Sequence, residues 1–275
     1  MVTLPELRKE PLSLNPKRLL LFSTPKVGKT TLVSGLENNL IIDVESGSRY
    51  VSGIVYDVKA EAVKSGNTVA KQLRLLSEAI VKANSEKGDY VYDYITIDTI
   101  TSLEKVAREM ATVLYKRSNV GKKFKGTDVV TELEMGAGYN YLRQAFAILY
   151  GYFDGLARNG IILLGHVKGS SIKRDGKEIS AIDIDLTGKL KQIVSADMDA
   201  IGILYRNKKN NNELIVSFKT TSDDLITGAR PKHLRNKEFV ISKLNENGEF
   251  EFYWDKIYLK NNKKEVKKND KAKED

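Results

Sequence analysis

Cysteine is absent from this chain of 275 residues, and histidine occurs only at His166 and His233. The absence of thiols excludes a disulfide framework, a thiol nucleophile and a Cys-ligated metal, so we do not expect a structural zinc site. No segment reaches the roughly 18 apolar residues that a membrane-spanning helix needs, and residues 1–10 carry charges where a signal peptide has an apolar core. We therefore expect a cytoplasmic protein that makes no contact with a membrane.

Acidic residues are the minority among the charges, with 36 Asp and Glu against 45 Lys and Arg, for a formal net charge of +9. This excess suits an anionic polymer as well as a nucleotide. Part of it lies in residues 259–275, which have the composition of a basic disordered tail. The rest of the chain is long enough for one full α/β core. We predict an N-terminal extension at 1–15, a single domain at 16–258 and the tail at 259–275.

A phosphate-binding pattern follows an apolar run at residues 18–22. The pattern G-x-x-x-x-G-K-[ST] lets backbone N–H groups and a helix N-terminus surround phosphates. We expect Lys29 to reach the outer phosphates and Thr30 to hold Mg²⁺, which makes ATP and Mg²⁺ the expected cofactors. The first glycine of the pattern is replaced by Ser23, and glycine eases a tight turn there, whereas Gly28 is kept. The predicted loop is Ser23, Thr24, Pro25, Lys26, Val27, Gly28, Lys29, Thr30 and Thr31.

Buried strands and amphipathic helices alternate along the first two thirds of the chain. Apolar runs predict strands at 39–45, 94–98 and 161–164, and apolar residues at spacings of three and four predict helices at 69–83, 103–113 and 139–156. A helix at about 29–38 is expected after the phosphate loop. Thr99, Thr101 and Ser102 are the candidate N-caps for the helix that follows the 94–98 strand.

Two polar segments, 116–138 and 166–190, lack periodicity and are predicted to be loops. Later in the chain, residues 201–206 are expected to pair with 214–219, and 239–244 with 250–254, as two β-hairpins. The order of these elements predicts an α/β fold with a mostly parallel central sheet flanked by helices, and with antiparallel hairpins at one edge.

The carboxyl ends of parallel strands form the usual ligand edge of an open α/β sheet, and polar residues end several strands here. Asp98 fits the Walker B role, an acid that holds the Mg²⁺ water shell opposite Thr30. Glu45 is the expected group for polarising the attacking water, with Asp43 as its competitor. His166 either touches the γ-phosphate or is a structural histidine at a strand end, and the spacing favours neither reading.

Positive charge gathers in the two predicted loops. Such clusters beside a nucleotide site are suited to gripping a phosphate backbone, with Tyr139 and Tyr141 available for base stacking; solvated surface lysines are the alternative. The first loop carries Lys116, Arg117, Lys122, Lys123 and Lys125. The second carries Lys168, Lys173, Arg174, Lys177, Lys189 and Lys191.

With these landmarks placed, the chain resembles the RecA-like recombination ATPases over roughly residues 14–245, in particular small phage-encoded single-strand annealing or recombinase proteins. The segments that carry the resemblance are 23–31, Ile42–Glu45, Ile97–Thr99, Gly165–His166, Leu186–Leu190 and Ser195–Asp199.

This resemblance implies a RecA-like P-loop core with Lys29, Glu45 and His166 as the catalytic group, in which Glu45 activates water and His166 senses the γ-phosphate. It further implies that 116–138 and 168–190 are DNA-binding loops. A basic residue, Lys219 or Arg230, is expected to enter the ATP site of a neighbouring subunit in a ring or filament. If the chain is phage-encoded, its compartment is the host cytoplasm.

The resulting hypothesis is an ATP-dependent protein that binds single-stranded DNA, forms homo-oligomers and promotes strand annealing or exchange. A single-strand-binding protein is a possible further partner. Two alternatives stay open: a P-loop kinase or GTPase acting on a small molecule, and a non-catalytic module that binds nucleotide and nucleic acid. The guanine-recognition pattern N-K-x-D is incomplete, since residues 207–210 read Asn-Lys-Lys-Asn.

Overall fold

The computed structural model describes residues 13–174, 177–220 and 226–260, without the side chains of 170–174 and 177–181. The α-helices are α1 (Lys29–Ser34), α2 (Val58–Ser65), α3 (Val69–Lys87), α4 (Ile100–Arg117), α5 (Val129–Glu132), α6 (Gly138–Gly151) and α7 (Leu190–Asp197). Short 3₁₀ helices occur at η1 (Ser48–Tyr50), η2 (Glu134–Gly136) and η3 (Trp254–Lys256). Most of the predicted extension and tail lies outside the described residues, so the division into three segments stays a prediction.

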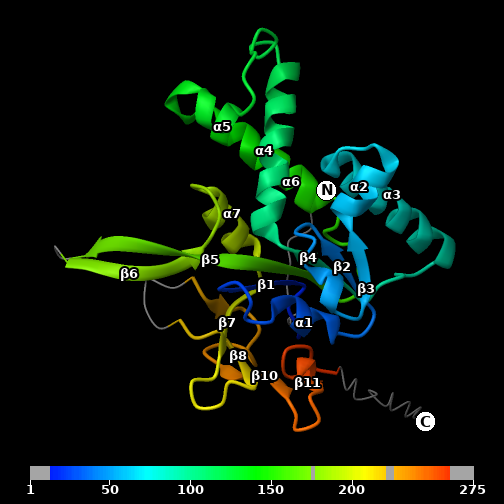
Figure 1. Ribbon diagram of the computed structural model, residues 1–275, viewed down its shortest axis with the longest axis vertical. Helices are drawn as coiled ribbons and strands as arrows, with labels where there is room; N and C mark the ends of the chain where they lie inside the picture. The colour runs from blue at the N-terminus through cyan, green and yellow to red at the C-terminus, as the bar shows by residue number, and fades with distance from the viewer. Residues whose placement is uncertain (1–12, 175–176, 221–225, 261–275) are drawn as a thin grey trace, which may run out of the picture.

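One large sheet organises the molecule (Figure 1). Its strands are β1 (Arg18–Ser23), β2 (Asn39–Asp43), β3 (Ile54–Asp57), β4 (Tyr94–Asp98), β5 (Gly160–Arg174), β6 (Lys177–Ile184), β7 (Ala200–Arg206), β8 (Glu213–Ser217), β9 (Gly228–Ala229), β10 (Glu238–Leu244) and β11 (Phe250–Phe252). Their main order is β11-β10-β8-β7-β1-β5-β4-β2-β3, and the strands from β7 to β3 in this order run parallel. The predicted α/β fold, with antiparallel hairpins at one edge, is confirmed.

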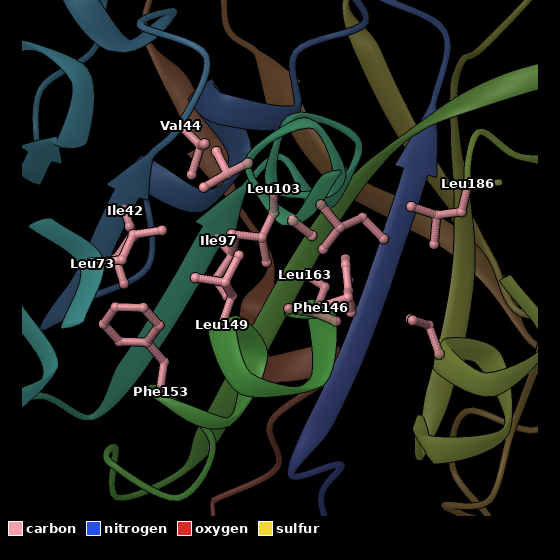
Figure 2. Packing of buried hydrophobic residues seen from close by; sticks show 14 of the residues in the cluster. Ile42, Val44, Leu73, Ile97, Leu103, Phe146, Leu149, Phe153, Leu163 and Leu186 are labelled. Carbon is pink, nitrogen blue, oxygen red and sulfur yellow. The ribbon is translucent and has the colours of Figure 1, made fainter. Parts of the chain in front are cut away.

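Strand β1 is buried on both faces, which explains its unbroken apolar run. Leu20 and Phe22 belong to the cluster that packs against α3, α4 and α6, whereas Leu19 and Leu21 belong to a second cluster with α1 and the C-terminal segment. Figure 2 shows the first cluster, in which side chains from β2, β4 and β5 meet those from the covering helices. The sheet is therefore held firmly from both sides at the strand that leads into the phosphate loop.

The predicted helices form, with some different ends. Helix α4 begins after Thr99, whose hydroxyl accepts the N–H of Ser102 at 3.2 Å, so the first of the three candidate caps is the one used. Helix α1 ends at Ser34 rather than near 38, and α6 ends at Gly151 rather than 156. Gly35 follows α1 where the ring of Phe252 leaves no space for a side chain, and the backbone turns there to enter β2.

The segment 116–138 is not simply a loop. Lys116 and Arg117 form the last turn of α4, and α5 and η2 follow within the segment. An α-helix rises about 1.5 Å per residue, so the 18 residues of α4 place these two side chains on the order of 27 Å from the Asp98 end. The first basic cluster therefore lies farther from the ligand edge of the sheet than the sequence predicted.

The prediction of a loop at 166–190 is wrong. Strand β5 continues past His166 to Arg174 and pairs antiparallel with β6, from Val167 opposite Ile184 to Arg174 opposite Lys177. Figure 1 shows the two strands projecting beyond the body of the protein as a ribbon. This ribbon is held by backbone hydrogen bonds between two polar segments, and a search for apolar periodicity does not detect such pairing.

Both C-terminal hairpins are confirmed, with Arg206 opposite Leu214 in the first and Leu244 opposite Phe250 in the second. The chain after β11 packs against α1, where the indole Nε1 of Trp254 donates a hydrogen bond to the carbonyl of Leu32 at 3.1 Å. No helix among the described residues has the length and apolar character needed to cross a bilayer.

Candidate nucleotide-binding site

The strand ends converge as predicted. In the parallel register Ser23 lies opposite His166 and Asp43 lies opposite Asp98, and Asp98 in turn lies opposite Leu164, two residues before His166 on β5. The segment between β1 and α1 then turns sharply, with φ of 65° at Lys26 and 114° at Gly28. The second value belongs to the left-handed region that favours glycine. The sheet thus brings the polar strand ends beside a tight backbone turn.

The turn between β1 and α1 presents backbone N–H groups that can donate hydrogen bonds to a ligand. Within the described parts of the chain, the backbone N–H groups of residues 26–31 have no hydrogen-bond acceptor, while Leu32 begins the helical ladder by donating to the carbonyl of Gly28 at 2.9 Å. Unpaired N–H groups at the start of a helix attract anions, and consecutive ones suit a phosphate chain. This observation supports the predicted fit of a nucleoside triphosphate to the loop.

Ser23 fits its position without strain. It is the last residue of β1, it precedes the turn, and its φ is not positive, so the freedom of glycine is not needed there. Its hydroxyl donates to the carbonyl of Thr24 at 2.8 Å and accepts from Lys29 Nζ at 3.1 Å. The serine therefore helps to hold Lys29 rather than distorting the loop.

Lys29 is buried, and its ammonium also donates to the Thr24 carbonyl at 3.2 Å. Burial lowers the pKa of Lys29, and the nearby Asp98 and Glu45 carboxylates partly offset that effect. A buried ammonium held by weak neutral acceptors is available to a stronger, anionic partner such as a phosphate. The geometry matches the expected role of Lys29.

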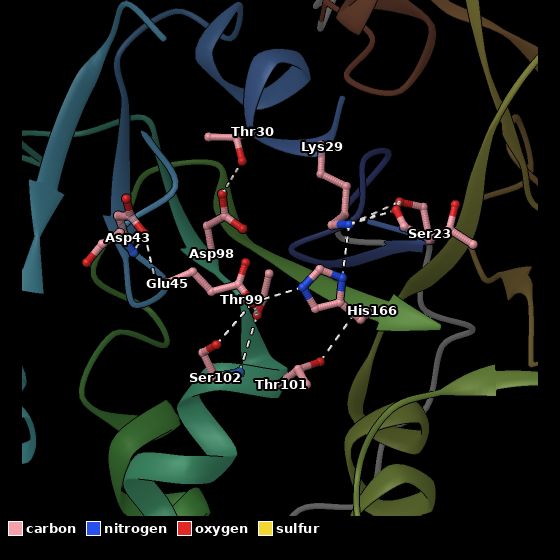
Figure 3. Close-up of polar contacts among 12 residues, drawn as sticks. Ser23, Lys29, Thr30, Asp43, Glu45, Asp98, Thr99, Thr101, Ser102 and His166 are labelled. Carbon is pink, nitrogen blue, oxygen red and sulfur yellow. Dashed lines mark hydrogen bonds and ion pairs between the residues drawn. The ribbon is translucent and has the colours of Figure 1, made fainter. Parts of the chain in front are cut away.

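Thr30 and Asp98 face each other, and the Thr30 hydroxyl donates to the Asp98 carboxylate at 2.6 Å (Figure 3). No group of three or more His, Cys, Asp or Glu among the described residues is placed to hold a metal ion. Mg²⁺ does not need such a cage, because it keeps several waters and takes substrate phosphates beside one or two protein oxygens. The hydroxyl and carboxylate pair is the donor set that such a site uses, so these residues fit the metal.

Glu45 lies between β2 and the start of α4, and its Oε1 accepts hydrogen bonds from the hydroxyls of Thr99 and Ser102, each at 3.1 Å. The same oxygen contacts His166 Nε2 at 2.8 Å. Burial acts to raise the pKa of Glu45, but the His166 contact and the two hydroxyls outweigh it, so the pKa is lowered. The carboxylate is thus fixed in direction and kept ionised.

Asp43, the other candidate for orienting the attacking water, is fully buried, and its carboxylate oxygens already accept hydrogen bonds from backbone N–H groups. One oxygen accepts the N–H groups of Glu45 and Ser46, at 2.9 and 2.7 Å, and the other accepts that of Ser48 at 2.8 Å. A carboxylate with these partners shapes the turn that carries Glu45 and is not free to orient a water molecule. The geometry favours Glu45 for the chemical role.

His166 connects Lys29 to Glu45, as Figure 3 shows. The Lys29 ammonium can only donate, so His166 Nδ1, at 3.3 Å, accepts, and the ring proton lies on Nε2 and points to Glu45. The backbone of His166 is fixed as well, since its N–H donates to the Thr101 hydroxyl at 3.3 Å and its carbonyl accepts from Asp185 N at 2.9 Å. This side chain therefore lies between the phosphate loop and the base of the β5–β6 ribbon.

The predicted DNA-contacting cations lie in several environments. Lys122, Lys123 and Lys125 after α4, Lys168 on β5 and Lys189 before α7 are exposed, and so are Lys116 and Arg117 in the last turn of α4. Lys116 lies over the ring of Phe124, at 5.9 Å from its centroid, and Lys191 is paired with Asp183. The side chains of Lys173, Arg174 and Lys177 lie outside the described residues.

The two tyrosines proposed for stacking differ. Tyr141 packs edge-on against Tyr115, with ring centroids 5.1 Å apart, and both belong to the hydrophobic core region. Tyr139 lies beside two backbone turns, since side chains added at Gly136 or Gly188 would touch its ring. Both tyrosines are half-buried against the same core cluster, so their role in base stacking stays a prediction.

Lys219 and Arg230 are both engaged within their own chain. Lys219 pairs with Glu238 at 3.3 Å, and Arg230 pairs with Asp199 at 3.2 Å. Arg230 follows Ala229, which pairs with Ala200 at the start of β7, the opposite edge of the sheet from the phosphate loop. A contact of Arg230 with a nucleotide therefore requires the site of another subunit, and such a role stays a prediction for both residues.

Replacing Asp98 by Asn is expected to stabilise the nucleotide-free protein. Burial raises the pKa of Asp98 from 3.8 to about 6, against the opposing hydrogen bond from Thr30, which corresponds to about 3 kcal/mol disfavouring the charged form. Because the folded-state pKa is raised, ionised Asp98 destabilises the folded protein by the full amount above pH 6. This destabilisation decreases as the pH falls toward 4. Urea unfolding in EDTA should show a gain of about 1–3 kcal/mol at pH 8 that shrinks at pH 5.

The conservative variant Thr30→Ser, which keeps the hydroxyl, is the control and should not show this dependence on pH. A destabilised Asp98→Asn protein at pH 8 would contradict the burial argument. The same variant should lose Mg²⁺-dependent activity, because an amide is a weaker ligand for Mg²⁺ than a carboxylate.

The parallel sheet, the loop of free N–H groups and the Thr30–Asp98 pair define a P-loop nucleotide-binding protein. The family model described as AAA domain matches residues 15–232, and the chain belongs to this family. Membership supports ATPase activity and nucleotide binding. No match was found among curated proteins. Among solved structures the chain is similar to the crystal structure of the RadB recombinase, at 15% identity over 87% of this chain and 92% of that chain, with a TM-score of 0.36.

Proposed function

We propose that this chain is an ATP-dependent single-stranded-DNA-binding protein that acts in strand annealing or exchange, in phage DNA recombination, and hydrolyses ATP at a subunit interface. The observation that carries the proposal is the position of His166, which contacts both Lys29 and Glu45 and begins the β5–β6 ribbon. A phosphate that takes the ammonium of Lys29 removes one of the two partners of this histidine. In this proposal the occupancy of the nucleotide site is linked to the base of the projecting β5–β6 ribbon.

A second contact joins the same two regions. Glu104, buried on α4, accepts the N–H of Thr187 at 3.0 Å just after β6, while the first turn of α4 holds Glu45 through Ser102. Helix α4 therefore touches the proposed water-activating group and the end of the ribbon. A rigid helix is a suitable element for transmitting a small displacement from one to the other.

The test is ATPase turnover with and without single-stranded DNA, in Mg²⁺, for the wild type and Lys29→Ala. We expect turnover to rise with DNA in the wild type and to be lost in the variant. DNA annealing that is unchanged in Lys29→Ala would favour the non-catalytic module. Consumption of GTP, or phosphorylation of a small acceptor without any effect of DNA, would favour the kinase or GTPase alternative.

Affinity for single strands is expected to fall steeply with salt. If the five lysines at 122, 123, 125, 168 and 189 contact phosphates, log affinity should fall with log salt concentration with a slope of about −3.5, because each contact contributes about −0.7. Anisotropy of a labelled oligonucleotide over a series of NaCl concentrations measures this slope. Joint replacement of Lys122, Lys123 and Lys125 by Ala should reduce it to about −1.4.

A slope near zero would reject the basic clusters as the DNA site. Replacing Lys82 and Lys87 of α3, which lie outside these clusters, by Ala is the matched control and should leave the slope unchanged. The experiment also distinguishes the contributions of the two clusters. If the joint replacement of Lys122, Lys123 and Lys125 leaves the slope unaltered, DNA binding belongs to the second cluster alone.

A further inference from the structure

Arg206 lies against the phosphate loop, although no sequence pattern includes it. It ends β7, and β7 pairs in parallel with β1, with Ile203 opposite Phe22. A side-chain carbon added at Gly28 would lie 3.0 Å from Arg206 Nη2, so the guanidinium lies close to the turn at Gly28. The φ of 114° is the reason why glycine is favoured at position 28, and a side chain there would in addition require the end of the Arg206 side chain to shift by a few tenths of an ångström.

Arg206 and the groups proposed for chemistry lie on opposite sides of the loop. In the sheet, β5 and β4 follow β1 on one side and carry His166 and Asp98, whereas β7 neighbours β1 on the other side. A triphosphate bound with its γ-phosphate toward Glu45 and the Thr30–Asp98 pair runs along the loop and leaves on the β7 side. The nucleoside end is therefore the part of the ligand that meets Arg206.

The guanidinium is free to take a ligand. Arg206 is half-buried, and across the described residues no carboxylate lies within ion-pair distance of it. The side-chain hydrogen bond that it makes to a described residue is weak, from Nη1 to the carbonyl of Asn211 at 3.5 Å. By contrast, several other arginines are paired with acids: Arg18, Arg74, Arg108, Arg158 and Arg230.

We propose that Arg206 is a base-binding residue, whose guanidinium plane stacks on the nucleobase of a nucleotide bound in the loop of the same subunit. This inference rests on the proposed nucleotide site. A guanidinium is planar, weakly hydrated and stacks on aromatic rings, whereas an ammonium at the same place is a point charge without a plane. The contact with the Asn211 carbonyl involves only Nη1, at one edge of the group.

The test compares ligands with and without a base. Calorimetric titration with ATP, ADP and inorganic tripolyphosphate, each with Mg²⁺, is carried out on wild type, Arg206→Ala, Arg206→Lys and the control Lys208→Ala, an exposed lysine of the same hairpin turn. Arg206→Ala and Arg206→Lys are both expected to weaken ATP and ADP on the order of tenfold, with less than about twofold change for tripolyphosphate. Lys208→Ala should bind all three ligands as the wild type does.

Several outcomes overturn the inference. Equal losses for ATP and tripolyphosphate would make Arg206 a phosphate ligand, and full affinity in Arg206→Lys would show that charge suffices. Unchanged affinity for ATP and ADP in Arg206→Ala would show that this residue is not part of the nucleotide site. Failure of the proposed function would give a different result from failure of this inference. In that case the wild type itself would show no ATP binding, or its ATPase turnover would not respond to DNA.

Discussion

Glu45→Gln is expected to lower kcat for ATP hydrolysis on the order of 10²–10⁴-fold, the range that a positioned general base contributes. The amide keeps the size of the side chain and its capacity to accept from Thr99 and Ser102, but it cannot take a proton from water. Because Glu45 is not expected to contact the ground-state nucleotide, KM should change little. Steady-state turnover at saturating ATP and Mg²⁺ measures the effect.

Two comparisons make this test specific. Glu37→Gln changes an exposed acid just beyond α1 and should leave turnover unchanged. Asp43→Asn removes an ionised acceptor from three backbone N–H groups and should lower thermal stability, whereas Glu45→Gln should not. Full turnover in Glu45→Gln would transfer the chemical role to another group.

Lys29→Ala is expected to lower kcat/KM for ATP by about 10²–10³-fold or more, the size of effect seen when a preorganised charge donor is removed from a developing anion. Nucleotide affinity should fall as well, since the ammonium is the one buried cation beside the loop among the described residues. Turnover and calorimetric titration with ATP measure the two effects separately.

The fold of this variant should be intact. Burial lowers the pKa of Lys29, so its charge is not a source of folding stability, and Ala at the start of α1 is a good helix former. Lys26→Ala replaces an exposed lysine of the same loop and is the matched control, with an expected effect below about tenfold. Equal activities for Lys29→Ala and Lys26→Ala would contradict the assignment of the phosphate loop.

Local patterns in the sequence predict the centre of the sheet well. Strands β1, β2 and β4 are buried on both faces because α3, α4 and α6 cover one side and α1 with the C-terminal segment covers the other, and such burial favours mostly apolar runs. The start of helix α4 is also predicted from the sequence, since Thr99 supplies a side-chain cap. Elements of this kind can be predicted because the residues that determine them are close together in the sequence.

Elements that depend on distant pairing were not predicted. Strand β3 is four residues long and leaves Ile54 exposed at the sheet edge, and α2 follows it directly. The β5–β6 ribbon depends on the pairing of two polar segments, and β9 is a two-residue strand that pairs with β7. Their stability comes from register with partners elsewhere in the chain, which composition does not reveal.

The same distinction applies to the candidate site. Lys29, Thr30 and Asp98 follow from motif and spacing, and their placement together agrees with the rule that strand ends form the ligand edge. Arg206 could not be found in this way, because its contact with Gly28 exists only through the neighbouring positions of β7 and β1 in the sheet. The outward course of the ribbon from His166 was missed for the same reason.

The contact between Trp254 and helix α1 has a practical consequence. The chain contains one tryptophan, and its indole is hydrogen-bonded to the carbonyl of Leu32, one turn beyond the phosphate loop. Its emission therefore comes from a single environment in hydrogen-bond contact with α1. The protein carries its own optical probe for events in the loop, and rapid-mixing experiments can follow them without attaching a dye.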